Sequence, residues 1–334
     1  MRGWRLLALV VVTLGALAAL VSVSGVSPWD ALVAGVQGAF GDARGLSGTF
    51  TRMTPLLFSG LGVAVALRAG LFNIGVEGQL LVGALAAAAT GIYLTGLPAP
   101  VHVTLSILAG AMAGMLWAAP AGLIKVWRGG HEVITTIMLN YIARSFTKYM
   151  AANPMQDPSS DMATTVYVAD SARLGLATVS PAISWALVVG VGVAVFLFWW
   201  MRRTVAGYEL NAVGAGPDAA QAAGVDIKKT MIWAMAASGA LAGIAGAMQV
   251  CAYEFRFYDG ISPGYGFDSL AVALIALADP LVVCLSSLLF GALAQGAQFA
   301  QIATEIPKEI AAVVQGVVIL LAAGIGWQRL RRTD

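Results

Sequence analysis

The sequence predicts an all-α protein that crosses a membrane several times, as a single transmembrane domain over residues 1–334. Of these 334 residues, 59% are hydrophobic and 11% are charged, and the mean hydropathy is +0.82. In a soluble domain about a quarter of the residues are charged, so this composition excludes a water-soluble fold. Apolar runs of about 20 residues have the length that a helix needs to span a bilayer. We therefore expect about ten transmembrane helices, one of them short.

The first 150 residues predict five spans and one external segment. Residues 6–24 follow two arginines and are long enough to form an uncleaved first helix rather than a signal peptide. Residues 28–50 are rich in glycine and mixed in polarity, which favours an external segment with an amphipathic helix. These two stretches make up an N-terminal part, 1–50, which precedes a first half, 51–150. The remaining four spans are expected at 54–68, 74–93, 101–124 and 133–149.

The remainder of the chain predicts a long external loop, a cytoplasmic loop and a second half. The external loop covers 151–180 and the cytoplasmic loop covers 202–229. Residues 266–278 are apolar but too short to cross a bilayer unaided, so we expect a re-entrant or broken span there. The second half runs over 230–328. Full spans are expected at 183–200, 231–252, 281–300 and 310–325.

The distribution of basic residues places both termini in the cytoplasm. With an even number of crossings, twelve basic residues fall on the cytoplasmic side and six fall outside, in agreement with the positive-inside rule. Arg144 lies within a span. The twelve are Arg2, Arg5, Arg68, Lys125, Arg128, Arg202, Arg203, Lys228, Lys229, Arg329, Arg331 and Arg332.

Glycines recur at four-residue spacing within the predicted spans. Gly110 and Gly114 lie in one span, and Gly239 and Gly243 lie in another. Small residues at this spacing let two helix backbones approach closely in lipid. This pattern predicts helix packing within one compact bundle rather than a special dimer motif.

The cytoplasmic loop carries a short helix that suits a docking element for another protein. Two basic residues stand at each end of this loop. Pro217 opens the helix and Gly224 ends it, which is the usual asymmetry of helix termini. Small side chains facing outward from residues 217–223 would give a partner a smooth surface. The alternative is an ordinary structured loop between two spans.

Polar residues interrupt the apolar run at 71–79. If this stretch is helical, Asn73 and Glu77 share a face because they are four residues apart, and Gly75 and Gly78 loosen the backbone between them. A carboxylate within a span is costly, so such residues often line a cavity or a transport path. The alternative is a solvated, structural Glu77 near the cytoplasmic end of its span.

A second polar interruption precedes the short apolar segment. Gly264, Phe267 and Asp268 lead into it, and Asp279 and Pro280 follow it. The arrangement repeats the first interruption in the opposite half of the chain, which suggests two related halves. Repeats of this kind place a central path at their interface.

Several enzyme signatures are missing from the sequence. There is no G-x-x-x-x-G-K-[ST] phosphate loop, so the chain is not expected to bind and hydrolyse ATP by that route. We find no Cys/His spacing typical of a metal site, no Ser/His/Asp arrangement and no basic nucleic-acid face. We therefore expect no catalytic residues, no metal, no cofactor of its own and no nucleic-acid partner.

Three stretches resemble a known family. Residues 72–79, 132–141 and 207–224 are similar to the membrane permeases of bacterial ABC importers for ribose-type sugars, branched-chain amino acids and nucleosides. The first two stretches look most like the nucleoside, or simple sugar, branch. The sequence departs from the family pattern at Gly216, where asparagine is common, and at residues 276–279, where a glycine-containing form is usual.

The resemblance implies a permease subunit of an ATP-driven importer in the bacterial cytoplasmic membrane. Together with a second permease subunit, which is either a copy of this chain or a paralogue, it would form the path for nucleosides or related sugars. A separate cytoplasmic ATPase would bind the ATP and dock on the helix at 217–223, which would act as the coupling helix, and an external lipoprotein would deliver the substrate. The resemblance implies path residues Asn73, Glu77, Gln79, Asn140, Phe267 and Asp268, and docking residues Gly214, Pro217, Asp218, Ala219, Ala220 and Gly224.

One alternative from another class stays open at this point. An ion-coupled secondary transporter of a small polar solute would use Glu77 as its ion-linked carboxylate. Uptake that continues without any ATPase and stops when the ion gradient is removed would identify it.

Overall fold

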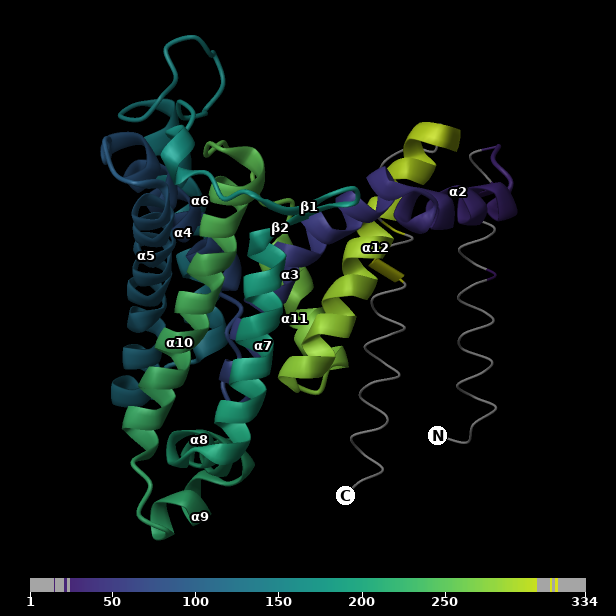
Figure 1. The fold of residues 1–334 in the computed structure, drawn as a ribbon. Coiled ribbons are helices and arrows are strands. Elements are labelled where there is room, and N and C mark those ends of the chain that lie inside the picture. Colours follow the sequence, from purple (N-terminus) through teal and green to yellow (C-terminus); the bar gives the residue numbers. More distant parts are fainter. Residues whose placement is uncertain (1–14, 16–20, 23–24, 305–312, 314–315, 318–334) are drawn as a thin grey trace. The chain divides into compact units, whose positions relative to one another are not determined.

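A computed structural model describes residues 15, 21–22, 25–304, 313 and 316–317. The predicted first helix at 6–24 and last span at 310–325 lie almost wholly outside these residues. Most of the described helices are joined by short links, and a long loop separates α6 from α7 (Figure 1). They are α2 (Pro28–Phe40), α3 (Ala43–Arg68), α4 (Val76–Tyr93), α5 (Ala99–Arg128), α6 (Glu132–Ala152), η1 (Asp170–Ala172), α7 (Trp185–Arg203), α8 (Val205–Ala215), α9 (Pro217–Ala222), α10 (Ile227–Met248), the π-helix η2 (Gln249–Glu254), α11 (Tyr265–Ile275) and α12 (Pro280–Thr304).

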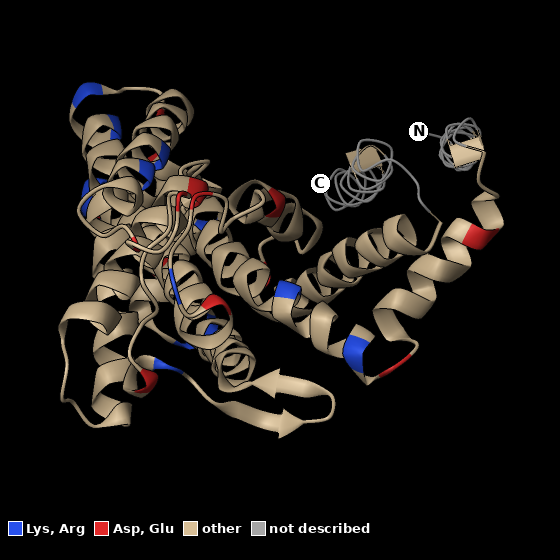
Figure 2. Cartoon of the chain, turned by 90° about the horizontal axis from the view of Figure 1, so that it is seen from above, with Lys and Arg blue, Asp and Glu red and all other residues tan. Residues whose placement is uncertain are grey.

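Six of these helices are long and apolar enough to cross a membrane, which confirms a multi-pass helical membrane protein. Figure 2 shows how few charged residues interrupt the uncharged ribbon. The predicted span at 133–149 forms α6, which is not among the six and carries Glu132, Arg144 and Lys148. The short apolar segment forms α11, of eleven residues. The six are α3, α4, α5, α7, α12 and the continuous stretch Ile227–Glu254.

Two expectations about the external segments need correction. The helix that contains the predicted span 54–68 begins earlier, at Ala43, so residues 43–50 of the predicted external segment form the start of α3, where the hydroxyl groups of Ser47 and Thr51 donate to carbonyls one turn earlier. A two-stranded sheet also forms around the end of the predicted external loop 151–180, from β1 (Leu176–Val179) and β2 (Ala182–Ser184), so the chain is not wholly α-helical.

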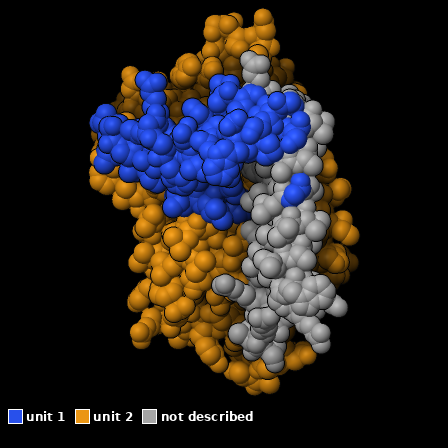
Figure 3. Space-filling model, turned by 90° about the vertical axis from the view of Figure 1, so that its right-hand side faces the viewer, with its two compact units in different colours: residues 1–53, 178–183, 288–334 blue, residues 54–177, 184–287 orange. Residues whose placement is uncertain are grey.

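The chain divides into two compact units, which Figure 3 colours separately. Unit 1 comprises residues 1–53, 178–183 and 288–334. Within it, a Cβ on Gly38 of α2 would overlap with the ring of Phe299 on α12. The Arg52 side chain donates to Gln295 at 3.0 Å and to Gln298.

Unit 2 comprises residues 54–177 and 184–287, and its centre is built from α4, α5 and α10. A Cβ on Gly114 of α5 would overlap with the carbonyl oxygen of Gly239 on α10, and one on Gly243 would overlap with that of Gly110. A Cβ on Gly83 of α4 would likewise overlap with Gly243. The predicted glycine-mediated packing within one bundle is therefore confirmed.

Candidate functional site

The link between α3 and α4 positions the first set of polar residues. Asn73 lies in this link and not in a helix, because α4 begins at Val76, so the predicted shared helical face of Asn73 and Glu77 is wrong. Gly70 adopts φ +73°, which turns the chain out of α3. The Asn73 Oδ1 then accepts a hydrogen bond from the backbone N–H of Gly75 at 3.0 Å. This local bond favours a turn over a continued helix.

Asn73 and Gln79 form a reciprocal amide pair. Asn73 Nδ2 donates to Gln79 Oε1 at 2.9 Å, and Gln79 Nε2 donates to Asn73 Oδ1 at 3.1 Å. Asn73 Nδ2 also donates to the hydroxyl of Ser238 on α10 at 2.8 Å. All three side chains are almost completely buried. Buried amides need such partners, so this pair fixes the link against α10.

Asn140 joins the same link to α6. Its Oδ1 accepts from the backbone N–H of Gly78 at 2.9 Å, and its Nδ2 donates to the carbonyl of Ile74 at 2.9 Å. A Cβ on Gly78 would lie 2.8 Å from Asn140 Oδ1. Gly78 lies within α4 and permits a close approach of α6, and its expected loosening of the backbone stays a prediction.

Glu77 ties α4 to α11. Its Oε2 accepts from the backbone N–H of Gly266 at 2.7 Å, and a Cβ on Gly266 would overlap with the Glu77 backbone. The residue is 9% exposed. The solvated side chain considered as an alternative is therefore wrong for this chain. A buried carboxyl group requires a partner of this kind because its transfer from water is costly.

Phe267 and Asp268 differ from the other four candidates. Phe267 is 50% exposed and Asp268 is half-buried. Among the residues that the structure describes, the Asp268 carboxylate has no hydrogen bond or ion pair. Both lie in the first turn of α11, directly beside Gly266 and its bond to Glu77. The structure thus brings these two residues next to Glu77, with the Phe267 side chain exposed and the Asp268 side chain half-buried.

The docking segment, α8 and α9 (Val205–Ala222), lies at one end of unit 2, and the loop that follows α6 lies at the other end (Figure 1). The predicted helix is confirmed, and Gly224 ends it with φ +85°. Pro217, Asp218 and Ala219 are exposed. Ala220 is buried, however, in a cluster of three. Its members are Val213, Ala220 and Val225.

The burial of Ala220 corrects the expectation that the small side chains of the docking helix all face outward. A six-residue helix on a surface must turn one face inward, and Ala220 occupies that face. Gly214 is exposed, but a Cβ there would overlap with the carbonyl oxygen of Arg68, so this glycine lies closely against the end of α3. The exposed docking surface is therefore narrower than expected.

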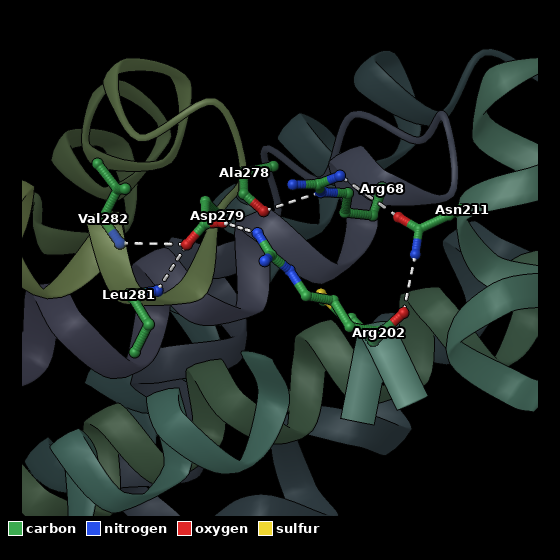
Figure 4. Close-up of polar contacts among 8 residues, drawn as sticks. Arg68, Arg202, Asn211, Ala278, Asp279, Leu281 and Val282 are labelled. Atoms are coloured by element: carbon green, nitrogen blue, oxygen red, sulfur yellow. Dashed lines mark hydrogen bonds and ion pairs between the residues drawn. The ribbon is translucent and has the colours of Figure 1, made fainter. Parts of the chain in front are cut away.

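Sequence reasoning missed a polar cluster beside the docking segment, and Figure 4 shows it in detail. Arg68 and Arg202 were counted for topology alone, although basic residues at span ends near an acidic residue are a usable signal.

Gln249 was also missed. Its Oε1 is buried without a hydrogen-bond partner among the described residues, at the start of η2. Its amide within an apolar span was the available signal, and π-helical turns are frequent at functional sites.

Comparison with known proteins assigns the family. A family model described as the branched-chain amino acid transport system permease component matches residues 45–323. A guanosine ABC transporter permease of Bacillus subtilis is 37% identical over 318 residues, covering 94% of this chain and 91% of that protein. A nucleoside ABC transporter permease of Lactococcus lactis is 32% identical over 294 residues, covering 85% and 80%. A glucose ABC transporter permease of Haloferax volcanii is 32% identical over 287 residues, covering 83% and 75%.

These matches confirm the resemblance to the nucleoside branch. The family implies partners that supply ATP hydrolysis and substrate binding, and its permeases are transport components rather than enzymes. Membership therefore sets aside the ion-coupled alternative. The chain belongs to the family of branched-chain amino acid transport system permease components and is a multi-pass permease subunit of an ABC importer in the bacterial plasma membrane.

Proposed function

We propose that this permease carries nucleosides, or related sugars, along a path bordered by the first turn of α11. The observation that carries the proposal is the placement of an exposed Phe267 and an unpaired Asp268 beside the buried Glu77. An exposed aromatic ring can stack on any of the bases, because every base has a π-face. A carboxylate can accept hydrogen bonds from sugar hydroxyl groups. The names of the guanosine and nucleoside relatives favour the same substrate class.

The six proposed path residues then have two different roles. Phe267 and Asp268 contact the solute. The other four hold the α3–α4 link and α11 in the shape that the path needs, since their polar atoms already bond to protein groups. These four are Asn73, Glu77, Gln79 and Asn140.

We propose ten crossings, two related halves at 51–150 and 230–328, and cytoplasmic termini, within one domain over 1–334. Six helices have the length and composition of spans. With 21 residues, α6 is about 30 Å long, which matches the hydrocarbon core. The remaining three are α11, as a short or broken span, and the segments 6–24 and 310–325.

The partners follow from this arrangement. A cytoplasmic ATPase docks on the exposed residues of the docking segment, at Pro217, Asp218 and Ala219. An external lipoprotein delivers the solute to loop 151–180. The part of this loop that belongs to unit 2, residues 151–177, lies at the end of the unit opposite to the docking segment. A second permease, identical or paralogous, completes the path in the bilayer. ATP binds to the ATPase, and this chain needs no cofactor of its own.

Uptake of labelled nucleosides and labelled pentoses tests the proposal. Cells that carry this chain with its ATPase should accumulate nucleosides, and cells without the ATPase should not. Uptake of pentoses alone would move the substrate class to sugars. Nucleoside uptake that continues without the ATPase would contradict the proposed mechanism.

A further inference from the structure

We propose that two arginines, Arg68 at the end of α3 and Arg202 in the last turn of α7, link the docking segment to the turn between α11 and α12, so that a movement of the docking segment reaches the solute path through this turn. The inference rests on the proposed function, because it explains how ATPase docking would act on Phe267 and Asp268. The residues that carry it form what we call the arginine clamp. These are Arg68, Arg202, Asn211, Ala278 and Asp279 (Figure 4).

One side of the clamp belongs to the docking segment. Asn211 lies on α8, and its Nδ2 donates to the carbonyls of Gly207 at 2.8 Å and Met201 at 3.2 Å. Its Oδ1 accepts from Arg68 at 3.5 Å. Gly214, on the same helix, packs against the backbone of Arg68. The side chain and the backbone of Arg68 thus both contact α8, so a movement of this helix would act on Arg68.

The other side of the clamp is the turn between α11 and α12. Arg68 Nε donates to the carbonyl of Ala278 at 2.9 Å, and Arg202 forms an ion pair with Asp279 Oδ2 at 3.0 Å. Asp279 is also fixed by its second oxygen, which accepts from the backbone N–H of Leu281 at 3.0 Å. The Arg202 guanidinium lies 4.0 Å from the ring centroid of Phe198, which orients it. Two arginines on different helices therefore bind two successive residues of one turn.

The turn between α11 and α12 has an unusual backbone. Leu277 and Ala278 both adopt φ 52°, in the left-handed region that residues with a Cβ rarely occupy. Such a conformation persists where the surroundings hold it in place. The clamp supplies that hold at Ala278 and at Asp279. A turn kept in this state by outside contacts can change its path when those contacts shift, which suits an element that transmits movement.

Helix α11 carries the movement from this turn to the solute path. It has eleven residues, so it is about 16 Å long and can move as one rigid rod. At its far end, the backbone N–H of Gly266 bonds to Glu77, and Phe267 and Asp268 follow directly. A displacement of the turn therefore changes the position of these two side chains relative to α4. Each contact along this route lies within unit 2.

The test compares transport with ATP hydrolysis in the same preparation. The permease is reconstituted in proteoliposomes with its ATPase, its second permease and its binding protein. Arg202→Gln and Asp279→Asn each remove the ion pair, and asparagine can still cap α12. The control is Arg203→Gln, because Arg203 is an exposed neighbour of the same charge that has no ion pair within the described part of the chain.

We expect Arg202→Gln and Asp279→Asn each to lower the nucleosides transported per ATP hydrolysed about tenfold. The double variant should be no worse than either single one, because both remove the same link. Arg203→Gln should match the wild type. An unchanged ratio, a proportional loss of both activities, or loss of the ATPase on pull-down would overturn the inference. Failure of the proposed function is distinguishable, since the wild type would then show no ATP-dependent nucleoside uptake.

Discussion

The buried polar network around Asn73 and the docking helix α9 both lie in polar interruptions of an apolar chain, yet they are stabilised in opposite ways. Asn73, Gln79 and Asn140 are held by hydrogen bonds to residues of distant helices, inside the protein. The docking helix α9 is held by a small apolar cluster around Ala220, and its polar residues Asp218 and Gln221 are exposed. Changes in the first region should therefore affect the fold, whereas changes on the outer face of the second should affect a partner.

The largest effect is expected for Asn73→Leu. The substitution leaves Gln79, Ser238 and the N–H of Gly75 without a partner in a buried site, and each unpaired group is costly. We expect a loss of about 3 kcal/mol in the free energy of unfolding. Thermal unfolding in detergent measures it, with Gln221→Leu on the exposed face of α9 as the control. Equal melting temperatures for the two variants would contradict the comparison.

A pair of substitutions within the docking helix sharpens the comparison. Ala220→Arg forces a charge into the cluster with Val213 and Val225, so we expect a loss of about 2 kcal/mol in stability. Ala219→Arg lies on the exposed side, so the permease should keep its melting temperature and lose its ATPase on pull-down. The idea of a one-sided docking surface fails if Ala219→Arg retains the ATPase as well as the wild type does.

The smallest effect concerns the turn between α11 and α12. Ala278 has φ 52°, which glycine adopts without steric cost. We expect Ala278→Gly to raise the free energy of unfolding by about 1 kcal/mol, reduced in part by the added freedom of the unfolded chain. The matched control is Ala276→Gly, at a residue with φ −73°, where the same change should destabilise. Equal shifts for both variants would show that the left-handed backbone stores no strain.

The sequence predicted the helices well because hydrophobic length is a local property. The predicted spans at 74–93 and 281–300 agree with α4 and α12 to within a few residues at each end. The docking helix was predictable for the same reason, since Pro217 and Gly224 mark its ends locally.

The site was less predictable because its partners are distant in sequence. Asn73 bonds to Ser238 across 165 residues, and Glu77 bonds to Gly266 across 189 residues. A helical spacing rule cannot reveal these contacts, and it does not apply to Asn73, which lies before the start of α4. The inward face of Ala220 was missed because a chain of small residues shows no amphipathic pattern.

The central claim is that the exposed side of α11 contacts a nucleoside, and Phe267→Ala tests it most directly. The side chain is 50% exposed, so its removal should leave the fold and ATPase retention unchanged. Loss of base stacking of about 1–3 kcal/mol should lower nucleoside uptake by about tenfold or more at low substrate concentration. Uptake equal to that of the wild type would contradict the claim and move the solute path away from α11.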